Sequence, residues 1–299
     1  MPADRQVNGR KRIGDGDWPV AIGVWLAMMK GAILTSRKIC AAVGGLLLGS
    51  VCAICLVSWP SAAQDTKLPF AVGEKLRFAV RWRLVPAGEA ELFLGKEETA
   101  PGRWKATAKA NSIGYVSNLY KVDDEYQSTF RNPAFCSNEI RKVINEGDRH
   151  REISLFFDLR RHLALMRDRE TRPNPQPPRQ VQSSIPNCVH DIISAFYYTR
   201  SQPLAVGQSF EVAINDGIRT IPLRIEVQAK EEIQTPIGKF EATRVEPDVF
   251  SGNLFKEKGR MFVWFSDDAS RLPVQMKAQM GIGTITASLA AVEHVDANP

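Results

Sequence analysis

The sequence predicts a mostly β protein, in which one amphipathic helix packs against an antiparallel sheet. Three observations predict this. Between residues 75 and 293 most segments alternate apolar and polar residues, which is the period of half-buried strands. Turn signals separate these segments at a spacing typical of an antiparallel meander. Only one segment, residues 189–200, has the periodicity of a helix.

Seven strands are predicted ahead of the helix. In the first of them Leu76, Phe78 and Val80 alternate with charged residues, and a turn at 86–88 leads into the second strand. The seven predicted strands are residues 75–84, 89–94, 104–110, 123–130, 139–145, 151–158 and 162–167.

A segment rich in proline and arginine follows these strands. Five prolines and four arginines crowd residues 167–186, and such proline density disfavours regular structure because proline lacks a backbone donor. We expect a surface loop there. A basic contact for acidic lipid head groups or for a partner is the alternative.

The helix is predicted over residues 189–200. Asn187 is the expected N-cap, and Asp191 lies in the first turn, where the helix dipole favours a negative charge. The apolar stripe of this helix consists of Ile193, Phe196 and Tyr197. Because such a stripe must be covered, we expect the helix to pack on the sheet. The later predicted strands are residues 210–214, 221–227, 239–246, 259–266, 272–280 and 284–293. The strand at 259–266 is apolar on both faces, which predicts an interior position.

The N-terminus has the pattern of a secretory signal. Basic residues lead into an uncharged apolar run at 39–57, and small residues follow at 61–63. We therefore expect a leader at 1–63, cleavage after Ala63 and export to the periplasm or cell envelope. A single β-rich domain at 64–299 then remains. The apolar run is 19 residues long, close to the ~20 that span a bilayer, so an uncleaved anchor is the alternative. The start of translation stays open between Met1, Met28 and Met29.

The charge and cysteine content of the chain after residue 63 argue against one class of function and predict one covalent bond. After residue 63 there are 32 basic and 30 acidic residues, and this balance argues against nucleic-acid binding. Of five cysteines only Cys136 and Cys188 lie beyond the leader. In an oxidising compartment they predict one disulfide, with a stabilisation of roughly 3–4 kcal/mol. A reactive or metal-binding thiol is the alternative.

No motif in the sequence predicts catalysis. The four histidines, which are His150, His162, His190 and His294, have no metal-ligand spacing to one another. His190 lies two residues after Cys188, but a capping or buried hydrogen-bonding role is the expected one. A G-x-S-x-G elbow, an H-E-x-x-H pair and a glycine-rich phosphate loop are all missing from the sequence. We predict no catalytic residue, no metal and no cofactor.

Several motifs in fixed order resemble the exported bacterial family catalogued as domain of unknown function 3108. They are V-G-E-K-L-R-F at 72–78 with Trp82 and 86–90, D-I-I-S-A-F-Y-Y-T-R at 191–200 with 204–207, and the segments 235–240, 263–268 and 271–274. The resemblance covers nearly all of 70–293 and implies export and a mostly β fold, without catalytic residues. It also leads us to expect a curved sheet or half-open β-barrel wrapped about the helix, similar to periplasmic lipoprotein carriers. The cysteine pair resembles that of a subgroup.

Three functions are consistent with these observations. The leading one is an envelope protein that is not an enzyme and binds an apolar or amphipathic, lipid-like ligand between the sheet and the helix. The candidate lining residues are Trp82, Ile193, Phe196, Tyr197 and Trp264. The second is an assembly module that contacts other envelope proteins through the Pro/Arg-rich loop and a sheet edge. The third is a hydrolase with an unfamiliar site around His190, Asp191 and Tyr197. Membrane contact is expected only through the leader, if it stays uncleaved.

Overall fold

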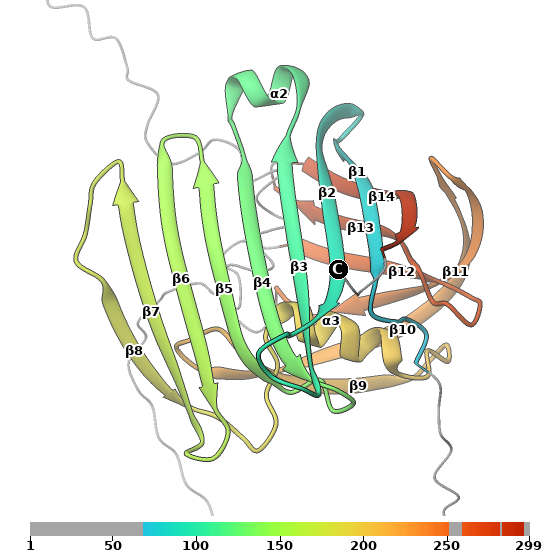
Figure 1. Ribbon diagram of the computed structural model, residues 1–299. Coiled ribbons are helices and arrows are strands. Elements are labelled where there is room, and N and C mark those ends of the chain that lie inside the picture. The colour runs from blue at the N-terminus through green and yellow to red at the C-terminus, as the bar shows by residue number, and fades with distance from the viewer. Residues whose placement is uncertain (1–67, 251–258, 282, 296–299) are drawn as a thin grey trace, which may run out of the picture.

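The computed structural model describes residues 68–250, 259–281 and 283–295, and these form one antiparallel sheet of 14 strands with two helices (Figure 1). The mostly β fold is therefore confirmed. The first eight strands are β1 Glu74–Trp82, β2 Val85–Lys96, β3 Arg103–Ser112, β4 Asp123–Arg131, β5 Ser137–Glu146, β6 Arg149–Asp158, β7 Leu163–Arg172 and β8 Arg179–Ser184. The other six are β9 Ser209–Asn215, β10 Thr220–Thr235, β11 Gly238–Pro247, β12 Gly259–Ser266, β13 Pro273–Met280 and β14 Gly283–His294. The helices are α2 Gly114–Leu119 and α3 Ile192–Ser201.

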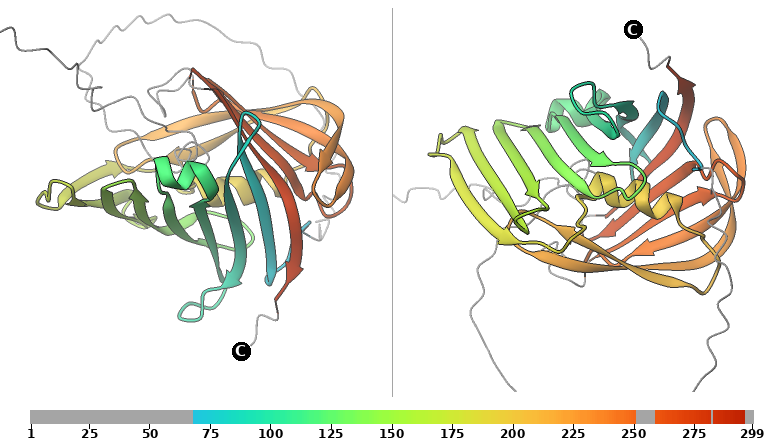
Figure 2. Two further views of the ribbon diagram at one scale, coloured as in Figure 1. Left: turned by 90° about the horizontal axis from the view of Figure 1, so that it is seen from above. Right: turned by 60° about the horizontal axis from the view of Figure 1, so that its bottom comes forward.

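The sheet consists of two meanders that join along β1 and β14. Its strand order runs from β8 to β1 and then from β14 to β9, so β8 and β9 are the two edges. The join pairs Glu74 with His294 at one end and Trp82 with Ile285 at the other. The sheet is strongly curved and open, and the connection from β8 to β9 runs through α3 (Figures 1 and 2).

The predicted strands are all present, but the first turn was placed wrongly. Residues 86–88 lie inside β2, and the chain reverses at Arg83 and Leu84, where Arg83 has a φ of 53°. Gly88 is needed in the strand because a Cβ there would lie 2.5 Å from the carbonyl oxygen of Asn111 on β3. The Pro-Ala-Gly sequence therefore marks a close approach of two strands and not a turn.

The prediction of a loop over residues 167–186 is wrong for most of that range. β7 continues to Arg172 and β8 begins at Arg179, which leaves only residues 173–178 as the connection. Four of the five prolines lie in this connection, so the flanking residues keep their backbone donors for pairing. A partly buried ion pair also joins β6 to β7, since Arg151 Nε donates to Asp168 at 2.7 Å.

Two features of the helices differ from the prediction. α2 was missed because its six residues are too short to show a period. α3 begins later than expected, and its N-cap is Asp191, whose carboxylate accepts hydrogen bonds from the backbone of Ile193 and Ser194, in place of Asn187. Most of α3 is buried, and Ile192, Phe196, Tyr198 and Ser201 are its half-buried residues, so no side of the helix is fully exposed.

The strand β12 holds an interior place between β11 and β13, as predicted. All of its residues from Met261 to Ser266 are buried. The leader at 1–63 and the apolar run at 39–57 lie outside the described residues. Neither of the two helices in the described part is long and apolar enough to cross a membrane.

Candidate functional site

An apolar cavity of about 80 Å³ lies between α3 and the sheet. Its walls come from one face of α3 and from strands in both meanders, β2 and β3 on one side and β10 to β13 on the other. The lining residues are Leu92, Ala108, Ile192, Ile193, Ala195, Phe196, Thr199, Leu223, Ile225, Val245, Pro247, Val249, Met261, Val263, Phe265 and Met276. Thr199 is the single polar residue among them. No titratable side chain lines the cavity, so it offers shape and apolar contact but no acid–base chemistry.

Two of the five predicted lining residues meet at this cavity. Ile193 and Phe196 project from α3 into it, and the ring of Phe196 lies 5.7 Å from that of Phe265 on β12. Tyr197 is fully buried but points elsewhere, with its ring 5.0 Å from Phe70 and 5.7 Å from Phe130. Burial in this aromatic cluster raises the pKa of Tyr197 far above its ordinary value.

The two tryptophans do not line the cavity. Val263 and Phe265 face it, so Trp264 between them projects from the opposite face of β12. There the Trp264 indole donates to Glu231 at 2.8 Å, and the ammonium of Lys277 lies 5.3 Å from the ring. Trp82 lies half-buried at the far end of β1.

The lining residues that the prediction missed come mostly from the second meander. Leu223 and Ile225 on β10 belong to the alternating apolar set that identified that strand, so their common face was visible in the sequence. Because β12 is apolar on both faces, the sequence did not show which of its residues face the helix. In the structure Met261, Val263 and Phe265 face it and line the cavity.

Hydrogen bonds fix the C-terminal end of α3 to two parts of the sheet. Arg200, which is fully buried, forms a two-pronged ion pair with Glu74 of β1 at 2.5 and 2.8 Å. Its guanidinium also donates to the carbonyls of Ser270 and Arg271 in the turn between β12 and β13. In return, Arg271 donates to three carbonyls at the end of α3, the nearest being that of Gln202 at 2.7 Å.

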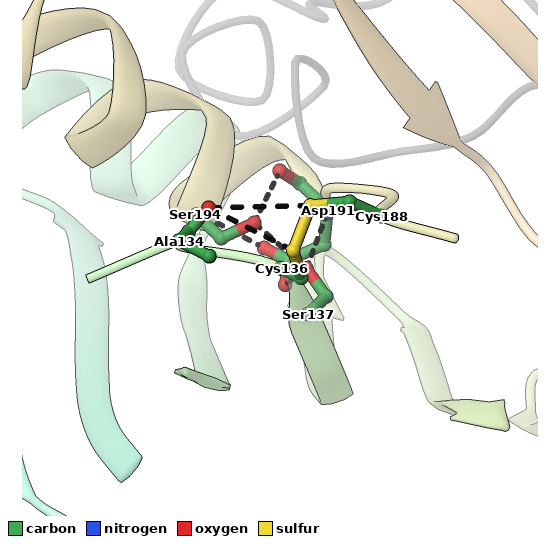
Figure 3. Close-up of a disulfide and its surroundings, with 6 residues drawn as sticks. All are labelled: Ala134, Cys136, Ser137, Cys188, Asp191 and Ser194. Atoms are coloured by element: carbon green, nitrogen blue, oxygen red, sulfur yellow. Dashed lines mark hydrogen bonds between the residues drawn. A yellow bond between two sulfur atoms is a disulfide. The ribbon is translucent and has the colours of Figure 1, made fainter. Parts of the chain in front are cut away.

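The N-terminal end of α3 is fixed by Asp191 and by the predicted disulfide (Figure 3). The carboxylate of Asp191 caps the helix and also accepts hydrogen bonds from Ser128 and Ser137, at 2.6 and 2.7 Å. Next to this network Cys136 and Cys188 are joined as a disulfide, which confirms the prediction from the sequence. Both ends of α3 are therefore tied to the sheet, and the wall of the cavity that it forms is held in position.

Replacing Asp191 by alanine is expected to lower the free energy of unfolding by about 3 kcal/mol, because the helix loses its cap and two buried hydroxyls lose their acceptor. Asparagine keeps one acceptor oxygen and should lose less. Urea denaturation of the two variants and the parent measures the difference. An alanine variant within the error of the parent would contradict the anchoring role.

His190 adjoins Asp191 but takes no part in this network. Its buried ring lies 5.0 Å from that of Tyr198, and neither ring nitrogen has a hydrogen bond of normal geometry within the described residues. Burial lowers the pKa of His190, although Asp191 and two nearby carbonyls oppose the shift. The expected hydrogen-bonding role falls to its backbone instead, which bonds to Ala213 and Asn215 of β9.

The three residues named for a hydrolase site do not form one hydrogen-bonded group in the described part of the chain. His190, Asp191 and Tyr197 have separate surroundings, so the residues of the hydrolase hypothesis form no hydrogen-bonded set. Within the described ranges, no group of three or more His, Cys, Asp or Glu residues could hold a metal ion.

Comparison with known proteins gives a family but no activity. The model of a family described as "Protein of unknown function (DUF3108)" matches residues 77–290. No curated protein is significantly similar to the chain.

Three solved structures resemble the fold weakly. A β-barrel-like protein of domain of unknown function DUF1849 from Brucella abortus shares 8% identity and a TM-score of 0.45, over 75% of this chain and 98% of that one. A putative exported protein with a YmcC-like fold from Bacteroides fragilis shares 10% identity and a TM-score of 0.34, over 76% and 98%. The hypothetical protein CT021 from Chlamydia trachomatis shares 7% identity and a TM-score of 0.32, over 73% and 87%.

Proposed function

The chain belongs to the DUF3108 family of proteins of unknown function, and we propose that it is an exported envelope protein that binds an apolar part of a lipid-like ligand. In this proposal the sheet wraps about α3 as a half-open barrel, and the ligand enters the cavity between them. The protein acts by binding and not by catalysis.

The apolar cavity is the observation that supports this proposal. Apart from Thr199, its lining consists of apolar residues, so an apolar group placed there would exchange water for apolar contacts, which is favourable. Since no charged side chain lines the walls, a polar ligand would lose its hydration without compensation.

The volume of the cavity limits what fits. Engineered cavities that bind benzene measure about 150 Å³, and sites for whole drug-sized ligands begin near 300 Å³. A cavity of about 80 Å³ therefore takes only the narrow end of a ligand. The rest would lie outward, past the half-buried Ile192, Phe196 and Pro247. Because α3 is fixed at both ends, the ligand has to enter without displacing the helix.

Filling the cavity tests the proposal. Ala108 lines it and Ala106, two residues earlier on the same face of β3, does not, although both are fully buried. Ala108→Leu is expected to weaken binding of a fluorescent single-chain fatty-acid analogue about tenfold or more, since one leucine side chain occupies the space that the chain end needs. Ala106→Leu is the matched control for overpacking and should bind as the parent does.

If the leucine variants fold poorly, a second measurement on the parent protein still tests whether it binds a lipid. Organic extraction of the purified parent protein, followed by mass spectrometry, is expected to release a lipid-like molecule. If the parent neither releases a lipid nor binds the analogue, the binding proposal is overturned.

Export is supported by the disulfide and by the signal pattern of the leader. A disulfide persists in oxidising compartments such as the periplasm and is rare in the cytosol. The Cys136–Cys188 bond is present in the structure. Fractionation of cells that make the full chain, with thiol labelling of each fraction, would show whether the oxidised protein lies outside the cytoplasm.

A second candidate is an assembly module, and the edge strand β8 supports it. Within the described residues β8 pairs only with β7, so its outer edge has free backbone groups that an extended peptide could pair with. Replacing residues 173–178 by a short glycine-serine connection would remove the proline-rich loop beside this edge without touching the cavity. Unchanged partners in cross-linking of the envelope would argue against the module.

A further inference from the structure

Four large apolar side chains are exposed together on one rim of the open sheet. Leu84 is 82% exposed and Val85 46%, and both lie at the turn between β1 and β2. Tyr115 is 70% exposed and Leu119 57%, and both lie on α2. These four residues are called the apolar rim below. Large apolar side chains held this far into water require an explanation.

The two elements of the apolar rim are neighbours. Gly88 on β2 pairs with Ser112 on β3, and the backbone of Ile113 donates to the carbonyl of Ala87 at 3.0 Å. α2 therefore rises beside the β1–β2 turn, and both views place them at the same end of the sheet (Figures 1 and 2).

The exposed side chains are held outward by anchored backbone. At the β1–β2 turn, Arg81 donates to the carbonyl of Leu84 at 2.9 Å, and the backbone of Arg83 donates to Thr284 of β14 at 2.7 Å. Under α2, Val116 is buried in the core. Local bonds thus fix the backbone of these segments, so the rim presents its apolar groups with little further backbone ordering on binding.

The charged residues within 81–87 and 113–122, which carry the rim, are all basic, and the nearest exposed acidic residues in the sequence are Glu89 on β2 and Asp123 on β4. Arg81, Arg83 and Lys121 are exposed, and residues 81–87 and 113–122 contain no aspartate or glutamate. Basic residues beside exposed leucine and tyrosine are the combination that favours the interface of an anionic bilayer: the apolar groups enter the acyl boundary and the cations meet the phosphates. Tyrosine in particular favours that depth.

We propose that the apolar rim is a membrane-docking surface that inserts into a leaflet containing anionic lipid. A bilayer suits it better than a protein does, because the rim protrudes as a turn and a single helical turn. A protein partner would need a matching hollow, whereas lipid head groups part around such a projection. This contact is independent of the leader and of what the cavity binds.

Hydrogen exchange of the full chain tests the docking directly. With vesicles of phosphatidylglycerol and phosphatidylcholine, the peptides covering 81–86 and 113–121 should exchange more slowly than without vesicles. The double substitution Leu84→Asp with Leu119→Asp should abolish this protection and weaken vesicle binding about tenfold or more, since each apolar insertion is lost. Phe156→Asp is the matched control, because Phe156 is 48% exposed but lies on β6, away from the rim. It should leave the protection unchanged.

Three outcomes would overturn the proposal. If the chain is held to vesicles only through its leader, the rim peptides exchange at the same rate with and without vesicles. If protection rises with protein concentration in the absence of lipid, the rim joins two copies of the chain. If pure phosphatidylcholine vesicles protect the rim equally well, the basic residues do not select anionic lipid.

Discussion

Replacing Glu74 by alanine is expected to lower the free energy of unfolding by about 3–5 kcal/mol, the largest effect of any single substitution considered for this chain. Arg200 would keep its charge in a fully buried position and lose the carboxylate that binds it on both prongs. It would retain only backbone carbonyls as acceptors. Chemical denaturation followed by far-UV circular dichroism measures the loss.

Two controls separate the buried ion pair from a general charge effect. Arg77→Ala removes an exposed partner of Glu293 and should change stability by less than about 1 kcal/mol. Glu74→Leu combined with Arg200→Met removes both charges and should regain most of the loss, because no uncompensated charge is left buried. If the single and double variants are equally unstable, packing and not charge explains the effect.

Removing the disulfide is expected to have the second largest effect. The Cys136–Cys188 bond joins residues 52 apart, and opening a loop of that size destabilises by about 3–4 kcal/mol in the chain-entropy model. The free energy of unfolding should fall, but the start of α3 should stay in place in the folded state, because Asp191 still accepts hydrogen bonds from Ser128 and Ser137.

The double substitution Cys136→Ser with Cys188→Ser tests this without leaving a free thiol. Its urea midpoint should match that of the parent under reducing conditions, and both should lie below that of the oxidised parent. A reduced parent as stable as the oxidised one would show that the bond adds nothing to the fold.

The strands could be predicted because alternation is a local property of each segment. The disulfide could be predicted because only two cysteines lie beyond the leader. Alternation along Leu76, Phe78 and Val80 is decided within one strand, and it survives in the structure as buried positions. Cys136 had Cys188 as its only partner outside the leader. Neither inference required knowledge of what lies across the sheet.

Two of the features that escaped prediction, the cap of α3 and the partner of Glu74, depend on contacts between distant segments. Asn187 and Asp191 are equally good caps by residue type, and the choice was made by Ser128 and Ser137 on strands far along the chain. Glu74 continues the inward series of β1 by two residues from Leu76, so its burial could be suspected. Its partner lies 126 residues away, and no local pattern indicates it.

The lining of the cavity was predicted in part for a similar reason. The helical spacing of Ile193 and Phe196 places them on one face, and that face does meet the sheet. Trp264 lies in a strand that is apolar on both sides, so its apolar character does not decide the face. In the structure Val263 and Phe265 face the cavity, and the Trp264 indole donates to Glu231 on the opposite face.

The join between β1 and β14 can form only late in synthesis, because it pairs the first strand of the sheet with the last. Each meander grows from contacts between neighbours in sequence, which form early and quickly. The ladder across the join begins with Glu74 paired to His294, and a side-chain hydrogen bond from Arg77 to Glu293 beside it spans 216 positions. A nascent chain therefore exposes the outer edge of β1, unpaired, until β14 has emerged. During that interval the chain is most vulnerable to wrong strand pairing and aggregation.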